Sequence, residues 1–66
     1  MPRGGATNTF FEYRGWDVAV GRVGVRGEYD AIATNGGSCI RTRRFSGVGA
    51  KQRATDEIKA LIDRQS

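Results

Sequence analysis

The dipeptide Arg14-Gly15 constrains the fold most, because it separates two short segments rich in aromatic and β-branched residues. These segments, Thr9–Tyr13 and Trp16–Val20, are typical of strands, and a two-residue spacer ending in glycine predicts a β-hairpin. A two-residue turn places Tyr13 opposite Trp16. The hairpin register then follows from the turn length alone.

This register separates apolar from polar residues. Alternation along each strand puts the larger apolar side chains on one face, which we expect to turn toward the core. That face holds Phe11, Tyr13, Trp16, Val18 and Val20. The other face is mostly polar, and it holds Phe10, Glu12, Asp17 and Ala19.

A second hairpin is predicted over 28–34 and 38–45, around Asn35-Gly36-Gly37. Its register has two alternatives. A two-residue loop turns Ile40 inward and Arg41 outward, whereas a three-residue loop pairs Ile32 with Ile40 and exchanges the faces. We prefer the two-residue loop because it buries Tyr29 and leaves the arginines in water.

The spacing of the apolar residues changes near Gly49. From there to Gln65 they recur at the three- and four-residue intervals of an α-helix. The stripe consists of Ala50, Ala54, Ile58, Leu61 and Ile62. The opposite face is polar and of mixed sign, with Arg53–Glu57 and Lys59–Asp63 as candidate ion pairs four residues apart.

The sequence therefore predicts an α+β fold, with a four-stranded antiparallel sheet of two hairpins and one C-terminal helix packed on one face. Residues 1–8 are expected to be a flexible N-terminal segment, and residues 9–66 a single small β-β-β-β-α domain. The three glycines Gly21, Gly24 and Gly27 predict a loop or a bulged strand end between the hairpins. Their spacing matches no nucleotide-binding loop.

Composition argues against an enzyme and favours a binding module. The 66 residues include one cysteine and no histidine, which excludes the usual zinc sites and histidine-based triads. We expect no catalytic residue, no metal, no cofactor, no small-molecule substrate and no membrane partner. We expect Cys39 to be a small core or sheet residue, and the protein to be cytoplasmic.

The positive charge is concentrated in one part of the chain. The net charge is +4, yet the stretch from Ala31 to Thr55 contains no acidic residue. Its five cations are the candidate nucleic-acid-binding residues: Arg41, Arg43, Arg44, Lys51 and Arg53. Glu28 or Asp30 could neutralise part of this charge across the second hairpin.

The junction Gly47-Val48-Gly49-Ala50-Lys51-Gln52-Arg53-Ala54-Thr55 resembles the last strand-to-helix junction of double-stranded RNA-binding domains, over residues 45–62. Their motif there is a glycine-containing turn, then Ser-Lys-Lys-x-Ala-Lys. Lys51 matches the first lysine, and Arg53 is a displaced substitute for another. The resemblance implies contacts with RNA phosphates. The family's first helix and its loop histidine have no counterpart here.

A second resemblance is to small uncharacterised bacterial sheet-plus-helix domains. They open with an aromatic-basic-Gly-aromatic hairpin, here Tyr13-Arg14-Gly15-Trp16, and end with Ile-Asp, here Ile62-Asp63. This resemblance implies a fold and no activity.

Two functions follow as hypotheses. The first is a small non-enzymatic basic module that contacts the phosphate backbone of nucleic acid through the last strand and the helix N-terminus. The alternative is a protein-interaction or homodimerising domain, which would use an apolar patch formed by Phe10, Ile32 or Phe45 on an uncovered face or edge.

Overall fold

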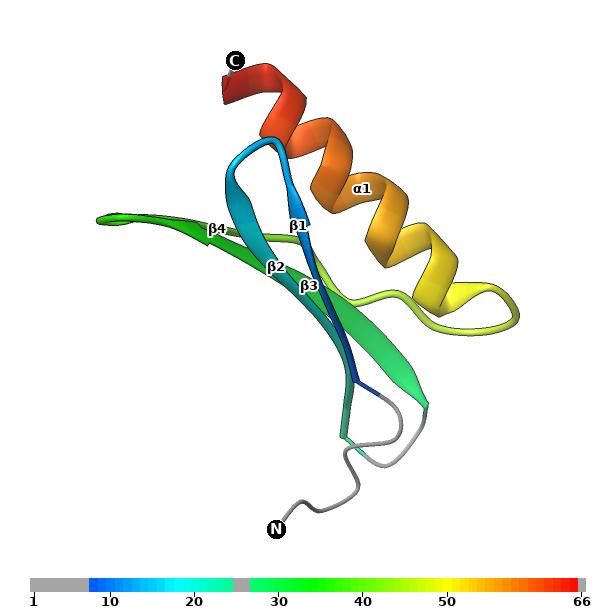
Figure 1. Ribbon diagram of the computed structural model, residues 1–66. Helices are drawn as coiled ribbons and strands as arrows, with labels where there is room; N and C mark the ends of the chain where they lie inside the picture. The colour runs from blue at the N-terminus through cyan, green and yellow to red at the C-terminus, as the bar shows by residue number, and fades with distance from the viewer. Residues whose placement is uncertain (1–7, 25–26, 66) are drawn as a thin grey trace, which may run out of the picture.

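The computed structural model describes residues 8–24 and 27–65, and within them it shows a four-stranded antiparallel sheet and one C-terminal helix (Figure 1). The strands lie in the order β1-β2-β3-β4. The elements are β1 (Thr9–Tyr13), β2 (Trp16–Val23), β3 (Glu28–Asn35), β4 (Ser38–Arg41) and α1 (Ala50–Gln65). The predicted fold is confirmed. The expectation of a flexible N-terminal segment falls on residues that lie, apart from Asn8, outside the described ranges.

The first hairpin has the register that its turn predicts. Tyr13 pairs with Trp16, and Phe11 pairs with Val18. Both turn residues have positive φ, 53° at Arg14 and 86° at Gly15. This combination is that of a type I′ turn, whose twist matches the twist of antiparallel strands. Arginine rarely adopts this conformation, which the two-residue turn imposes on it.

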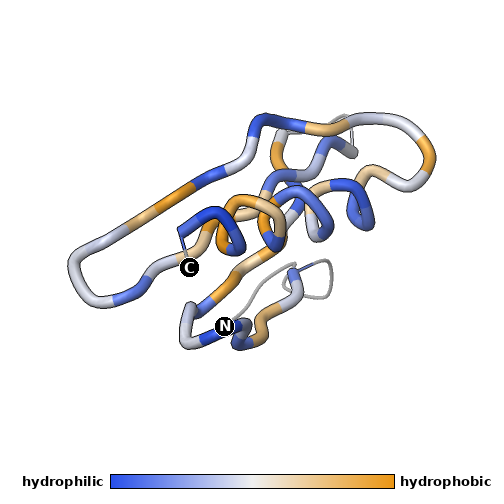
Figure 2. The backbone as a smooth tube through the Cα atoms, turned by 90° about the horizontal axis from the view of Figure 1, so that it is seen from above, coloured by the Kyte–Doolittle hydropathy of each residue, from blue (hydrophilic) through white to orange (hydrophobic). Residues whose placement is uncertain are grey.

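The predicted helical stripe faces the sheet and forms the core with it. Ala50, Ala54, Ile58 and Ile62 are buried, and Leu61 is half-buried. On the sheet, the buried side chains are Trp16, Val18, Val20, Ala31 and Ala33. The trace of α1 alternates between hydrophobic and hydrophilic colours along its length, as expected for a helix with one buried face (Figure 2).

The second hairpin adopts the two-residue alternative. Ala33 pairs with Ile40 and Asn35 pairs with Ser38, so Gly36 and Gly37 alone form the turn. Arg41 pairs with Ile32. It therefore lies on the face of the sheet turned away from the helix, as the preferred register predicts.

The last strand is shorter than predicted, because it ends at Arg41 and not at Phe45. Beyond it only an isolated bridge joins Tyr29 to Phe45. Continuation of the hairpin register would pair Tyr29 with Arg44, so the chain holds one extra residue here, as in a β-bulge. The extra residue turns Phe45 inward, where it packs against the core.

Thr42 explains why the regular pairing stops. Its side chain is buried, and its Oγ1 accepts a hydrogen bond from the backbone N–H of Ala31 at 3.0 Å. The same hydroxyl donates to the carbonyl of Arg43 at 2.8 Å. The Thr42 hydroxyl thus forms hydrogen bonds with backbone groups that would pair with other backbone groups if the strand continued.

The glycine-rich stretch between the hairpins divides into two parts. Gly21 belongs to β2, which runs to Val23, whereas Gly24 and Gly27 lie in the following connection. Residues 25 and 26 lie outside the described ranges.

Candidate functional site

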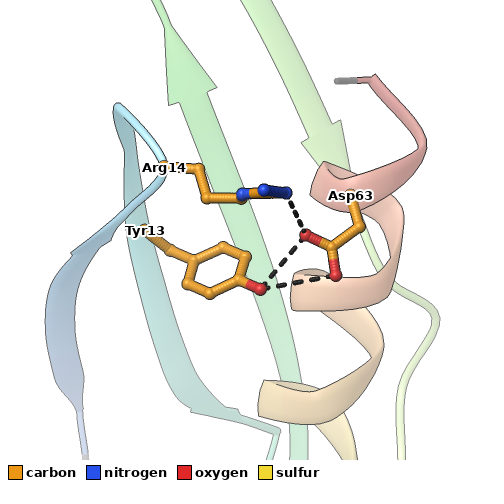
Figure 3. A network of polar contacts seen from close by, with 3 residues as sticks. All are labelled: Tyr13, Arg14 and Asp63. Carbon is orange, nitrogen blue, oxygen red and sulfur yellow. Dashed lines mark hydrogen bonds and ion pairs between the residues drawn. The ribbon is translucent and has the colours of Figure 1, made fainter.

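A polar cluster ties the first hairpin to the end of the helix (Figure 3). The hydroxyl of Tyr13 donates to both carboxylate oxygens of Asp63, at 3.1 and 3.3 Å. Arg14 Nη1 lies 3.1 Å from Asp63 Oδ1. Asp63 thus joins two neighbouring residues of the β1–β2 turn region to the last turns of α1.

This contact replaces the ion pair predicted along the helix. Neither Arg53–Glu57 nor Lys59–Asp63 forms in the described chain; Asp63 contacts the hairpin, and Lys59 Nζ lies 5.5 Å from the centre of the Tyr13 ring. A carboxylate near a helix C-terminus is unfavourable with the macrodipole. The Arg14 guanidinium offsets that charge.

The hydrogen bond with Asp63 raises the pKa of Tyr13 above its ordinary value of 10.0, with smaller contributions from desolvation and from the negative charge of Asp63. Tyr13 is therefore protonated at neutral pH. Arg14 and Asp63 remain about half exposed, with relative side-chain exposures of 52% and 48%. The cluster therefore acts as a structural tie between the hairpin and the helix.

The five candidate cations are all exposed, but they do not share one face. Arg41 lies on the side of the sheet away from α1, whereas Lys51 and Arg53 lie on α1 itself. Arg44 Nη1 is 3.8 Å from Glu28 Oε1, as expected for partial neutralisation across the hairpin. The guanidinium carbon Cζ of Arg43 lies 5.2 Å from the centre of the Phe45 ring.

The entrance to the helix combines exposed cations with a glycine backbone. The first turn contains no acidic residue. Gly49 has a φ of +80°, and its carbonyl accepts the hydrogen bond from the N–H of Arg53 at 2.9 Å. Gly49 is therefore the residue that caps the helix, in a conformation that suits glycine best. Lys51 and Arg53 extend from this turn into solvent.

The sheet has a second side that no described element covers, and we call it the outer face. It is the side turned away from α1 in Figure 1. Its central row crosses all four strands through successive cross-strand pairs: Phe10, Ala19, Ile32 and Arg41. A parallel row consists of Glu12, Asp17, Thr34 and Cys39.

The centre of the outer face is apolar and hollow. Phe10 is 72% exposed, although it is one of the largest side chains of the chain. With Ala19 and Ile32 it lines an open hollow of about 430 Å³, which Asp17 and Thr34 border at one end. Such an exposed aromatic in an apolar hollow is characteristic of an interaction surface.

The charges of the outer face are arranged unequally. Glu12 and Asp17 are cross-strand partners, an arrangement in which like charges repel. Neither carboxylate has an ion-pair partner among the described residues, and neither does Arg41 on the opposite edge. Asp30 on β3 lies on the same face, so the face presents the carboxylates of Glu12, Asp17 and Asp30 together with the guanidinium of Arg41 at its β4 edge.

Sequence reasoning located part of this surface. Phe10 and Ile32 were expected to contribute to an exposed patch, and both lie on the outer face. Phe45 was expected there too, but it packs against the core on the helix side. The opposed carboxylates were already implied by the Arg14-Gly15 turn, whose register places Glu12 opposite Asp17.

The remaining expectations concern aromatics, cysteine, metals and membranes. Phe11, Tyr13 and Trp16 pack in or against the core, as expected. Cys39 lies in β4 but is exposed, so it belongs to the sheet and not to the core. The described residues contain no metal-ligand cluster. Within them, α1 is neither long nor apolar enough to cross a membrane.

No model of a known protein family, no curated protein and no solved structure matches this chain. The resemblances to double-stranded RNA-binding domains and to small bacterial sheet-plus-helix domains stay predictions. The two motifs quoted for the second resemblance, around Tyr13-Arg14 and at Asp63, contact each other.

Proposed function

We propose that this chain is a non-enzymatic protein-interaction module that binds its partner through the outer face. The observation that carries the proposal is the exposure of Phe10 at the centre of an uncovered, hollow sheet surface. In a chain of this size, a large aromatic side chain is expected to contribute to the small core. Phe10 instead faces solvent, while the alternating residues Phe11 and Tyr13 pack against the core.

Crosslinking at residue 10 tests the proposal. A photoreactive benzophenone side chain replaces Phe10, and the chain is irradiated in the cells that produce it. We expect one discrete protein adduct, which the additional substitution Ile32→Asp removes because Ile32 lines the same hollow. The matched control carries the benzophenone at Val48, an apolar residue that is 96% exposed outside the outer face. Equal labelling at both positions, or none at residue 10, contradicts the proposal.

A second candidate function is binding to the phosphate backbone of nucleic acid, on the helix side. It is favoured by the exposed Lys51 and Arg53 on a first turn without acidic residues. Free N–H groups and the macrodipole attract anions to such a helix entrance. The unpaired carboxylates Glu12 and Asp17 would repel phosphates from the outer face, so the two candidate functions use different sides of the molecule.

Titrations at two salt concentrations test this second candidate. Duplex RNA, single-stranded RNA and duplex DNA are each added to the chain, and binding should weaken steeply as salt rises. The double substitution Lys51→Ala/Arg53→Ala should remove the binding, while Arg41→Ala on the other side of the sheet should preserve it. Absence of binding at low salt rejects the candidate.

A further inference from the structure

We infer that the partner of the outer face is a protein segment that binds as an amphipathic α-helix, with an apolar stripe flanked by lysine or arginine residues. The inference rests on the proposed function and specifies the chemistry of its partner. Three properties of the outer face select such a helix: its shape, the charges that border it and the pairing of its backbone groups.

The outer face holds an apolar groove that follows β2. Besides the hollow of about 430 Å³ beside Asp17, a second hollow of about 250 Å³ lies farther along β2, beside Asp30. Phe10, Ala19 and Ile32 line both hollows, so the two adjoin. In their cross-strand row Ala19 is the small residue, so it forms the floor between walls of Phe10 and Ile32. Such a groove accepts the ridge of apolar side chains on one face of a helix.

Carboxylates lie at both ends of this groove. Glu12 and Asp17 are cross-strand neighbours at one end, and Asp30 lies at the other. None of the three has an ion-pair partner among the described residues, although the chain carries a net charge of +4. Arg41 lies on β4, beyond the wall that Ile32 forms. The groove is therefore acidic within a basic protein, and it attracts the cations of a partner.

The backbone of the sheet disfavours an extended partner on this face. β2 and β3 each pair with strands on both sides, so their backbone groups are already hydrogen-bonded where the groove lies. A single extended segment laid on the face would find no backbone partners there, whereas an α-helix satisfies its backbone internally. α1 packs on the other face of the same sheet, so a second helix would complete a three-layer arrangement.

The positions of the carboxylates define the spacing of the partner's cations. Asp17 and Asp30 are four residues apart in the register of β2, because Asp30 pairs with Gly21. This separation is about 13 Å along the strands. On a helix, residues seven or eight positions apart share one face and lie about 10–12 Å apart along the axis, and long side chains cover the remainder. The partner helix therefore carries cations at this spacing, with apolar residues between them.

Alternative partners fit this surface less well. The phosphates of a nucleic acid or a lipid would be repelled by the three carboxylates. A free polyamine would match the charges but leave the apolar groove unfilled. A second copy of this chain offers α1, whose apolar residues are already buried, or an outer face with the same carboxylates.

Identification of the captured segment tests the inference. The chain with benzophenone at residue 10 is irradiated in the cells that produce it, and the crosslinked site on the partner is mapped by mass spectrometry. We expect a helix-forming segment with apolar residues between lysines or arginines seven or eight positions apart. Asp17→Lys/Asp30→Lys should lower the yield of the adduct at least ~10-fold. Asp56→Lys/Glu57→Lys, an equal change of charge at exposed residues of α1, should leave the yield unchanged.

An exchange of charge between the partners completes the experiment. The captured segment is synthesised as a peptide, and its affinity for the full chain is measured by fluorescence anisotropy. Replacing its two cations by glutamate should raise the dissociation constant at least ~10-fold. Misfolding of the chain cannot produce this loss, because the change lies in the peptide. The chain with Asp17→Lys/Asp30→Lys should bind the glutamate peptide with restored affinity.

Each remaining outcome rejects a defined claim. An adduct on a second copy of this chain, or on a segment without the expected pattern, overturns the inference. So does a glutamate peptide that binds the parent chain as tightly as the original peptide does, or that the lysine variant fails to rescue. These results leave the proposed function standing, because residue 10 would still contact a protein. Absence of any adduct at residue 10 rejects both.

Discussion

Asp63 is the residue at which local and long-range contacts compete. Helical spacing offers it Lys59, four residues earlier, yet it binds Tyr13 and Arg14 some fifty positions away. Sequence spacing cannot reveal such a choice, because it depends on how the hairpin lies against the helix. Arg14 makes this contact from a left-handed backbone conformation, which the two-residue turn requires.

The first prediction concerns the ionisation of Tyr13. In the Tyr29→Phe background, where Tyr13 is the remaining tyrosine, Asp63→Asn should lower the pKa of Tyr13. The reason is that the substitution removes the carboxylate that accepts its hydrogen bond. Titration of the tyrosinate absorbance in the near ultraviolet measures this shift. An unchanged pKa would show that Asp63 does not hold the hydroxyl in solution.

The same contact makes stability depend on pH in a defined direction. A folded-state pKa above the ordinary value of 10.0 means that the folded chain favours the protonated hydroxyl. This stabilisation is complete below pH 10 and is lost as the pH rises through the higher folded-state pKa. The free energy of unfolding, measured in urea, should decline over that range less steeply in Asp63→Asn than in the parent chain.

Thr42 provides the third prediction at the scale of single residues. Thr42→Val keeps the shape of the side chain but removes the hydroxyl that accepts from the N–H of Ala31. Leaving a buried amide unpaired costs about 1–3 kcal/mol. Urea unfolding should show this loss, and Thr42→Ser, which keeps the hydroxyl, should show less of it. Equal losses in the two variants would assign the effect to packing.

At the scale of elements, the first hairpin and the helix follow from local sequence. Arg14-Gly15 defines one register, and the stripe from Ala50 to Ile62 defines one buried face. The end of β4 does not follow, because it depends on a contact between Thr42 and β3. Predicting Phe45 inside the last strand was wrong for that reason. A single extra residue reverses the direction of every side chain beyond it.

The helix entrance gives a prediction at this scale. Gly49→Ala should destabilise the chain by about 1 kcal/mol, because alanine adopts a φ near +80° only with strain. Gly37→Ala is the matched control, since Gly37 has no positive φ and an added Cβ would meet nothing within 4 Å. Urea midpoints of the two variants should therefore differ. A control variant as unstable as Gly49→Ala would contradict this account of the turn.

At the scale of the whole molecule, the chain has two chemically different sides. One holds α1 with the exposed Lys51 and Arg53, and the other is the outer face with Glu12 and Asp17. Total charge, which is +4, conceals this division. The sequence correctly predicted that Arg41 points away from the core. It did not reveal that Arg41 is separated from Lys51 and Arg53 by the sheet.

This division predicts that stability and binding can be separated. Phe10→Ser should change the free energy of unfolding by no more than ~0.5 kcal/mol, because the ring is 72% exposed. Ile58→Ala should cost about 2–5 kcal/mol, because Ile58 is fully buried in a core this small. Urea unfolding of both variants checks the contrast. A large loss in Phe10→Ser would mean that Phe10 serves the fold and not the outer face.

The most direct measurement of the central claim compares the backbone amide resonances of the isotope-labelled full chain alone and in an extract of the cells that produce it. In the extract we predict shifts that cluster at Phe10, Ala19, Ile32 and Arg41, the central row of the outer face. Phe10→Ser should abolish them. Resonances that stay constant, or shifts that gather on α1 instead, would contradict the claim that the outer face is the interaction surface.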